Sequence, residues 1–182
     1  MNGAGSVDDL DLAVELVNTA HTPAGPADRL TDVAHFQDVL AEFGEHRLAK
    51  AMAPGDLRPL RTLRDHLHGV FVAETAAAAV PLLNELLTRA GAVPQLRAVG
   101  TGEARLEWGA GRRGYPALAA RLPGALAEFV TEHGVRRLGA CAATPCGRVF
   151  VDRTRPGNRR YCCEQCNDRV ASAAYRERRR TG

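Results

Sequence analysis

Residues 141–169 read CAATPCGRVFVDRTRPGNRRYCCEQCNDR and contain all five cysteines of the 182-residue chain. Four of the cysteines follow the spacing C-x4-C-x15-C-x3-C: Cys141, Cys146, Cys162 and Cys166. Two close pairs separated by enough chain for a β-hairpin can close a tetrahedral shell of thiolates around Zn²⁺. The spacing therefore predicts a structural zinc site with no open position for a catalytic water.

The fifth cysteine leaves the ligand set open. Either Cys162 or Cys163 could pair with Cys166, and we prefer Cys162 because it directly ends the segment that returns toward the metal. Inert reduced thiols or a redox pair would also explain clustered cysteines. Ligand-like spacing on both sides of a predicted hairpin favours the metal.

The residues around the cysteines predict a small treble-clef-like zinc finger over 135–182. RVFVD (148–152) has strand character, RTRPGN (153–158) contains Pro and Gly for a reversal, and RRYC (159–162) returns toward the metal. Strong helix formers follow Cys166. A module of this size buries too little apolar surface to fold alone, so we expect zinc to supply its stability.

Charge is divided unevenly along the chain. Residues 134–182 hold twelve arginines against four acidic residues, a formal charge of +8, whereas the remaining residues carry −5. A basic module on a mildly acidic body is typical of a protein that binds a polyanion through the module. We expect DNA contacts from arginines around the metal and on the final helix: Arg159, Arg160, Arg169, Arg176, Arg178, Arg179 and Arg180.

The body, residues 1–134, is predicted to be a mainly α-helical domain. Apolar residues recur at helical spacing after Asp9, after Thr31 as an N-cap, and from Asp56 to Phe71. We expect another helix to restart at Pro81 after a bend in the alanine run, and a last helix that Pro123 kinks or splits. The fold class is therefore mainly α, with a minor β-hairpin and the C-terminal finger.

The minor β-hairpin is predicted over residues 95–108. QLRAVG and ARLEW are separated by turn residues in GTGE. GAGRRG, residues 109–114, then fits the dinucleotide pattern G-x-G-x-x-G, but no βαβ unit surrounds it, so we interpret it as a flexible turn. No H-E-x-x-H, P-loop or G-x-S-x-G motif occurs, and we expect no enzyme.

The composition indicates a folded protein of the cytoplasm. Apolar residues make up 45% of the chain and charged residues 25%. No long apolar run occurs, and the N-terminus lacks the basic and apolar segments of a secretory signal, so we expect no membrane span. Cytoplasmic thiols stay reduced, which favours metal binding, and a DNA-binding module would associate the protein with the nucleoid.

The C-terminal motifs resemble the CGNR zinc-finger family. C-x4-C, VFVD, RRYC and a C-x-x-R helix followed by arginines carry the resemblance, although Asn167 and Asp168 stand where the family usually has Gly and Asn. Members join this finger to an N-terminal helical domain called ABATE and are regarded as bacterial stress-induced transcriptional regulators. ELVNT (15–19) and LRTLRDHL (60–67) resemble ABATE segments. Position 163 is commonly serine in the family, which supports Cys162 as the ligand.

The resemblance implies a DNA-binding transcriptional regulator whose N-terminal domain senses a small-molecule effector or forms a homodimer. Asn18, Thr19 and Arg64 lie in the ABATE-like segments and could line a ligand pocket, or could be a helix C-cap and a solvated arginine. Two other functions compete. One is a protein-interaction adaptor that uses the finger, and the other is a small-molecule enzyme in the helical body.

Overall fold

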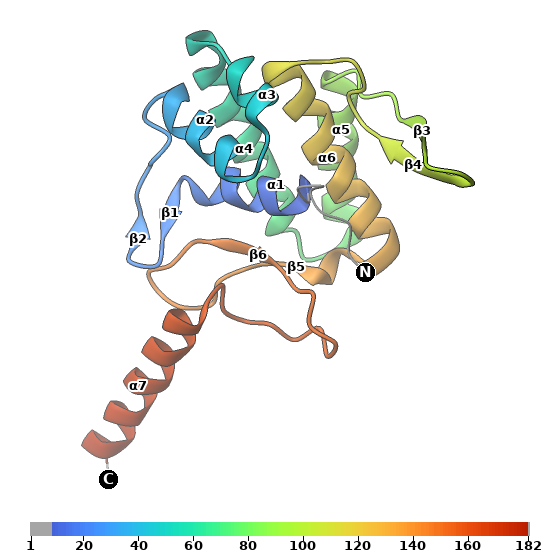
Figure 1. The fold of residues 1–182 in the computed structure, drawn as a ribbon. Helices are drawn as coiled ribbons and strands as arrows, with labels where there is room; N and C mark the ends of the chain where they lie inside the picture. Colours follow the sequence, from blue (N-terminus) through green and yellow to red (C-terminus); the bar gives the residue numbers. More distant parts are fainter. Residues whose placement is uncertain (1–8, 182) are drawn as a thin grey trace.

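The computed structural model describes residues 9–181 and shows a helical body, a small cysteine-containing module beneath it and a projecting final helix (Figure 1). The helices are α1 Asp9–Asn18, α2 Val33–Glu42, α3 His46–Lys50, α4 Leu57–Phe71, α5 Ala76–Arg89, α6 Gly114–His133 and α7 Glu164–Thr181, with short 3-10 turns at Pro54–Asp56 and Val135–Arg137. The predicted fold class is confirmed. Across the described residues, no helix combines the length and apolar character that a membrane span requires.

The centre of the body is α1, which packs against α4 and α6. Its residues Leu12, Ala13, Leu16 and Val17 are completely buried. A helix that is apolar around most of its circumference belongs in a core rather than on a surface. α2, α4 and α6 pack directly against α1, and α3 and α5 pack against these helices.

Two helix starts differ from the predicted ones. The N-cap of α2 is Asp32 rather than Thr31, because the Asp32 carboxylate accepts the His35 N–H at 2.9 Å. α5 begins at Ala76 instead of restarting at Pro81, since Thr75 caps its first turn by accepting the Ala78 N–H at 3.2 Å. The alanine run is the first turn of α5, where the strongest helix former outweighs the one hydrogen bond that Pro81 removes.

α6 is continuous through Pro123, so the predicted split does not occur. Pro123 and its neighbours Leu122 and Gly124 are all buried. Tertiary packing on both sides of the proline holds the helix together. Residues 46–50 form the short helix α3, which the sequence patterns did not predict.

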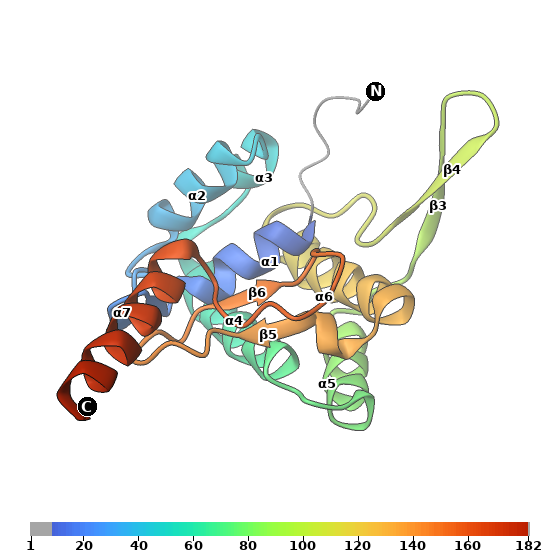
Figure 2. The same ribbon diagram turned by 90° about the horizontal axis from the view of Figure 1, so that it is seen from below.

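Three two-stranded antiparallel hairpins complete the described fold. They are β1 His21–Thr22 with β2 Gly25–Pro26, β3 Gln95–Val99 with β4 Glu103–Glu107, and β5 Leu138–Ala140 with β6 Val149–Val151. The β3–β4 hairpin is confirmed and stands clear of the body (Figure 2). The β1–β2 hairpin follows α1, in a segment for which the sequence patterns predicted no strand.

The partner of the VFV strand differs from the prediction. β6 pairs with β5, which precedes Cys141, so the first cysteine pair lies in the loop of this hairpin. The predicted partner, RRYC, forms no strand. It is linked to this region by the Arg160 carbonyl, which accepts the Ala142 N–H at 2.9 Å. All three residues of β6 are buried. Val149 and Val151 pack with Leu138 into the core of the helical body, and Phe150, on the other face, lies against the Arg159 guanidinium.

Candidate functional site

The four predicted zinc ligands converge. The Sγ atoms of Cys141, Cys146, Cys162 and Cys166 all lie within 4.8 Å of one another. Cys162 Sγ is 3.7 Å from both Cys146 Sγ and Cys166 Sγ. Thiolates bound tetrahedrally to Zn²⁺ at about 2.3 Å lie about 3.8 Å apart. The donor atoms therefore fit zinc in type, number and separation.

Three short segments position the four thiols. Cys141 follows β5 and donates its N–H to the Arg148 carbonyl at 2.8 Å, while the Cys146 N–H closes a turn onto the Ala143 carbonyl at 2.8 Å. Cys166 lies in the first turn of α7 and is completely buried. Only a few side chains pack around the thiols, so a metal would be the centre of this module.

Cys163 lies beside the group of four rather than in it. Its Sγ is 3.7 Å from Cys162 Sγ, but it is not a member of the mutually close cluster. The side chain is half-buried next to the start of α7. This placement supports Cys162 over Cys163 as the ligand, and the choice stays a prediction.

Burial and crowding perturb the thiols. Burial, with the neighbouring thiols, raises the pKa of Cys166 to about 11 and the pKa of Cys162 well above its usual value. Burial also acts on Cys141, but backbone N–H groups of Cys162 and Ala143 outweigh it and lower the pKa of that thiol. Zinc binds thiolates, so a bound cation displaces protons that this cluster otherwise holds.

Arg169, a predicted DNA contact, links the cluster to the helical body. One guanidinium nitrogen donates to Cys166 Sγ at 3.1 Å, and the other donates to the Pro23 carbonyl in the β1–β2 turn at 2.5 Å. Donation to a ligand sulfur orients the ligand and stabilises its negative charge. The structure thus places Arg169 in a supporting position behind the metal ligands.

Arg159, also a predicted DNA contact, braces the loop before Cys162. Its guanidinium donates to the carbonyls of Tyr161 and Cys162 and lies 4.8 Å from the Phe150 ring centroid. Its backbone N–H donates at 2.8 Å to the buried Asp152 carboxylate. Sequence reasoning missed Asp152; an isolated acidic residue directly after an apolar strand, in an arginine-rich segment, was the available signal.

Asp152 organises the reversal that follows β6. Besides the Arg159 N–H, its carboxylate accepts the Thr154 N–H at 2.9 Å and the Thr154 hydroxyl at 2.6 Å. Burial alone would raise the pKa of Asp152, but these hydrogen bonds lower it below the ordinary value. A charged, fully hydrogen-bonded carboxylate therefore fixes this loop.

Comparison with protein families matches two overlapping parts of the chain. Residues 10–145 match ABATE, which is described as "Putative stress-induced transcription regulator". The chain belongs to the ABATE family. Residues 137–179 match the CGNR zinc finger, which confirms the predicted combination and Zn²⁺ as its metal. No curated protein sequence matches this ABATE chain.

The remaining predicted DNA-contact arginines of the ABATE protein are exposed. Arg160 lies 5.8 Å from the Tyr161 ring centroid at the base of the finger. The others lie in the last turns of α7: Arg176, Arg178, Arg179 and Arg180. Residues 171–180 are all exposed, and both ribbon views show α7 leading away from the body (Figures 1 and 2).

The predicted pocket residues of the ABATE domain are buried and engaged with neighbouring groups. The Asn18 side-chain amide donates to the Val149 carbonyl at 3.1 Å and accepts the Val149 N–H at 2.8 Å. It thus makes the two hydrogen bonds that the backbone of a neighbouring strand would make. Thr19 donates to the Leu16 carbonyl at 2.7 Å, and Arg64 pairs with Asp28 at 2.7 Å. Asn18 therefore fixes β6 of the finger against α1.

Replacing Asn18 by alanine is expected to lower the free energy of unfolding by about 2–5 kcal/mol, because two buried backbone groups of Val149 lose their partner. Urea denaturation measures the change. Asn84→Ala, at an exposed position of α5, is the matched control and is expected to stay within about 0.5 kcal/mol of wild type. Equal stability of both variants would contradict the role given to Asn18.

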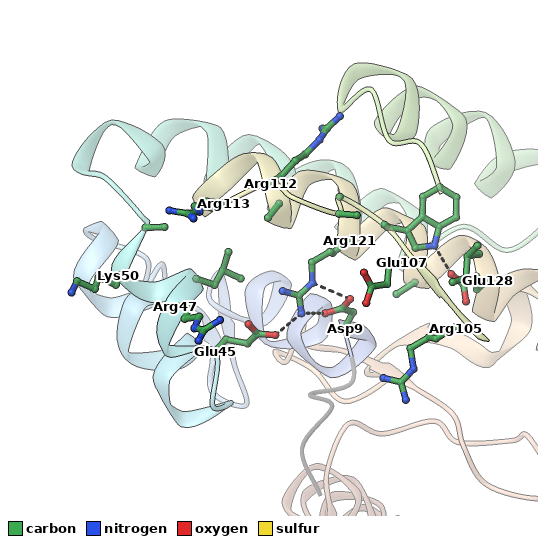
Figure 3. Close-up of a pocket in the computed structure, with 18 residues that line it drawn as sticks. Asp9, Glu45, Arg47, Lys50, Arg105, Glu107, Arg112, Arg113, Arg121 and Glu128 are labelled. Atoms are coloured by element: carbon green, nitrogen blue, oxygen red, sulfur yellow. Dashed lines mark hydrogen bonds and ion pairs between the residues drawn. The ribbon is translucent and has the colours of Figure 1, made fainter. Parts of the chain in front are cut away.

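The ABATE domain has a large cavity at another place. A volume of about 1240 Å³ lies between α3, the loop after β4 and α6, where Arg121 holds Asp9 at 2.7 Å and Glu45 at 2.5 Å (Figure 3). Residues of the GAGRRG segment line it, including Gly109 and Arg113. Sequence reasoning missed this cavity, because its walls come from segments far apart in the chain.

Proposed function

We propose that this ABATE protein is a DNA-binding transcription regulator. Residues 135–182, with zinc held by Cys141, Cys146, Cys162 and Cys166, would contact DNA, and residues 1–134 would sense an effector or assemble a dimer. One observation carries the proposal. The arginine-rich end of α7 is exposed over residues 171–180 and extends from the cysteine cluster, which fixes its base.

The dimensions and donors of α7 suit a DNA groove. Eighteen helical residues span about 27 Å, and a helix about 10–12 Å across fits the major groove. Arginine grips phosphate with two parallel hydrogen bonds and can also donate to the N7 and O6 atoms of guanine. A helix with four arginines near its end can therefore anchor on the backbone and reach base edges.

Metal binding leaves the finger basic. Four thiolates lower the formal +8 of residues 134–182 to +4, and Zn²⁺ raises it to +6. The zinc supplies a structural cross-link, and the chain's own arginines supply the contacts. Arg159 and Arg169 are engaged with the Cys162 carbonyl and Cys166 Sγ, so the contact surface that we propose consists of Arg160 and the four arginines of α7.

Effector sensing is supported by the cavity in Figure 3 rather than by Asn18, Thr19 and Arg64. Six basic and four acidic side chains line it, among them Arg47 and Lys50 at its outer wall. A cavity of this size accommodates a small molecule of ordinary metabolite size. Neither matching family is described as an enzyme, and we propose no catalytic site. The cytoplasm and its nucleoid are the proposed location.

The test is a salt series with double-stranded DNA and the intact, zinc-loaded protein. If the five arginines of the proposed contact surface each neutralise one phosphate, log K is expected to fall against log salt with a slope of about −4.5, from −0.9 per contact. Fluorescence anisotropy on duplexes of mixed sequence measures the slope. Absence of DNA binding at low salt, combined with salt-insensitive capture of a protein partner, would support the adaptor function instead.

A further inference from the structure

The β3–β4 ribbon has one face made of apolar side chains alone. Its register places Leu96 opposite Leu106 and Ala98 opposite Ala104 on that face. Side chains on a strand alternate between faces, so the remaining pairs share the other, mainly polar face. These pairs are Gln95 with Glu107, Arg97 with Arg105, and Val99 with Glu103. The ribbon is therefore amphipathic, as a strand pair is when one face is covered.

Among the described residues, most of this apolar face is uncovered, and Leu106 also lines the cavity of Figure 3. Leu96 is 75% exposed and Leu106 37% exposed, and Val93 just before the ribbon is 65% exposed. Figure 2 shows the ribbon extending from the body with space on both sides. An isolated two-stranded ribbon is only marginally stable in water, and further strands with an apolar face stabilise it. Further strands could therefore extend this two-stranded ribbon into a larger sheet.

Both edges of the ribbon are open, because β3 and β4 pair only with each other in the described part of the chain. Proteins protect an open edge with proline, a β-bulge or charged side chains. β4 has no proline or bulge, since its five residues pair consecutively with β3, but three of them are charged. Such an edge is a template only for a strand whose charges are complementary.

The charges of β4 select a particular partner and register. β4 reads Glu103-Ala104-Arg105-Leu106-Glu107. Antiparallel pairing with a second β4 about a two-fold axis at residue 105 would place like charges opposite each other, which is destabilising. A two-fold axis at Leu106 places Leu106 opposite Leu106 of the second copy. It also places Arg105 of each copy opposite Glu107 of the other. β4 is therefore complementary to its own sequence in this register.

We propose that β4 pairs with β4 of a second copy of this chain, forming a four-stranded antiparallel sheet. Leu96 and Leu106 of both copies then form one row of four leucines across the sheet, at strand spacings of about 4.8 Å. The symmetry is that of an ordinary two-fold dimer. The inference rests on the assembly role proposed above and does not require DNA binding.

The expected dimer is concentration-dependent. A standard interface uses about 20–30 residues a side, and the ribbon offers fewer, so association by this sheet alone is weak. Two linked fingers on one DNA molecule would strengthen it by raising the effective concentration. The pairing also brings the second copy's Ala104 opposite Trp108, a residue that lines the cavity of Figure 3.

Sedimentation velocity of the full zinc-loaded chain without DNA tests the proposal. Wild type is expected to approach twice the monomer mass as concentration rises. Arg105→Glu is expected to weaken association at least tenfold, because the new carboxylate faces Glu107 of the second copy. Within its own ribbon the same carboxylate faces Arg97, so the monomer keeps its fold. Val80→Ser, which alters a 43% exposed valine on α5, is the control and should dimerise as wild type does.

A charge exchange tests the register. Glu107→Arg alone is also expected to be monomeric, whereas an equimolar mixture with Arg105→Glu should restore the dimer, because each chain then faces an opposite charge. Wild type that stays monomeric over the whole concentration series would overturn the proposal. So would a dimer that survives either single substitution. Since DNA is absent, none of these results depends on whether the finger binds DNA.

Discussion

Cys162→Ala is expected to abolish zinc binding and to disorder the segments that carry the thiols on either side of β6, whereas Cys163→Ala keeps one zinc per chain. Cys162 Sγ lies at 3.7 Å from two other thiols of the cluster, so its removal opens the tetrahedron. A structural zinc contributes about 10–16 kcal/mol in small finger peptides, far more than any other single contact of this module. The loss of zinc from this variant is therefore expected to be complete.

The loss is expected to stop at the boundary of the helical core. Leu138, Val149 and Val151 belong to the same core cluster as the helices, so β5 and β6 keep their packing without the metal. Metal analysis after dialysis gives the stoichiometry, and hydrogen exchange locates the disordered segment. Retention of zinc by Cys162→Ala together with its loss from Cys163→Ala would show that Cys163 is the ligand.

Sequence periodicity predicted the helices that present one apolar face to the core. Leu60, Leu63 and Leu67 of α4 are buried at the predicted spacing. The partner of β6 could not be predicted in the same way, because Leu138–Ala140 is too short to carry a strand pattern. The structure shows neither a helix restart at Pro81 nor a split at Pro123, since flanking alanines and tertiary packing decide whether a helix continues through proline.

In the candidate site, too, local features could be predicted from the sequence and long-range contacts could not. Ligand spacing predicted four thiols that the structure brings together, because short-range chain geometry governs them. The net charge of the finger could not tell which arginines face inward. Arg169 reaches the Pro23 carbonyl, 146 residues away along the chain, and Asn18 reaches Val149 across 131 residues. Such contacts depend on how the finger docks on the body, which no local pattern encodes.

Replacing Arg178, Arg179 and Arg180 by alanine is expected to change the slope of log K against log salt from about −4.5 to about −2. All three are exposed in the last turns of α7, away from the cysteines. Zinc content should therefore stay at the wild-type value. A helix-dipole role for these cations would be worth only about 0.3–1 kcal/mol each and would not change the salt slope of binding.

The choice of these arginines separates contact from support. Substituting Arg159 or Arg169 would also remove hydrogen bonds to the Cys162 carbonyl or Cys166 Sγ, so weaker DNA binding could follow from a damaged finger. A triple variant of Arg29, Arg58 and Arg89 removes the same charge from exposed positions of the body outside the cavity and should leave the slope near its wild-type value. If the α7 variant binds DNA like wild type throughout the salt series, α7 is not the contact surface. A parallel loss in both triple variants would instead show that net charge, rather than the projecting helix, governs binding.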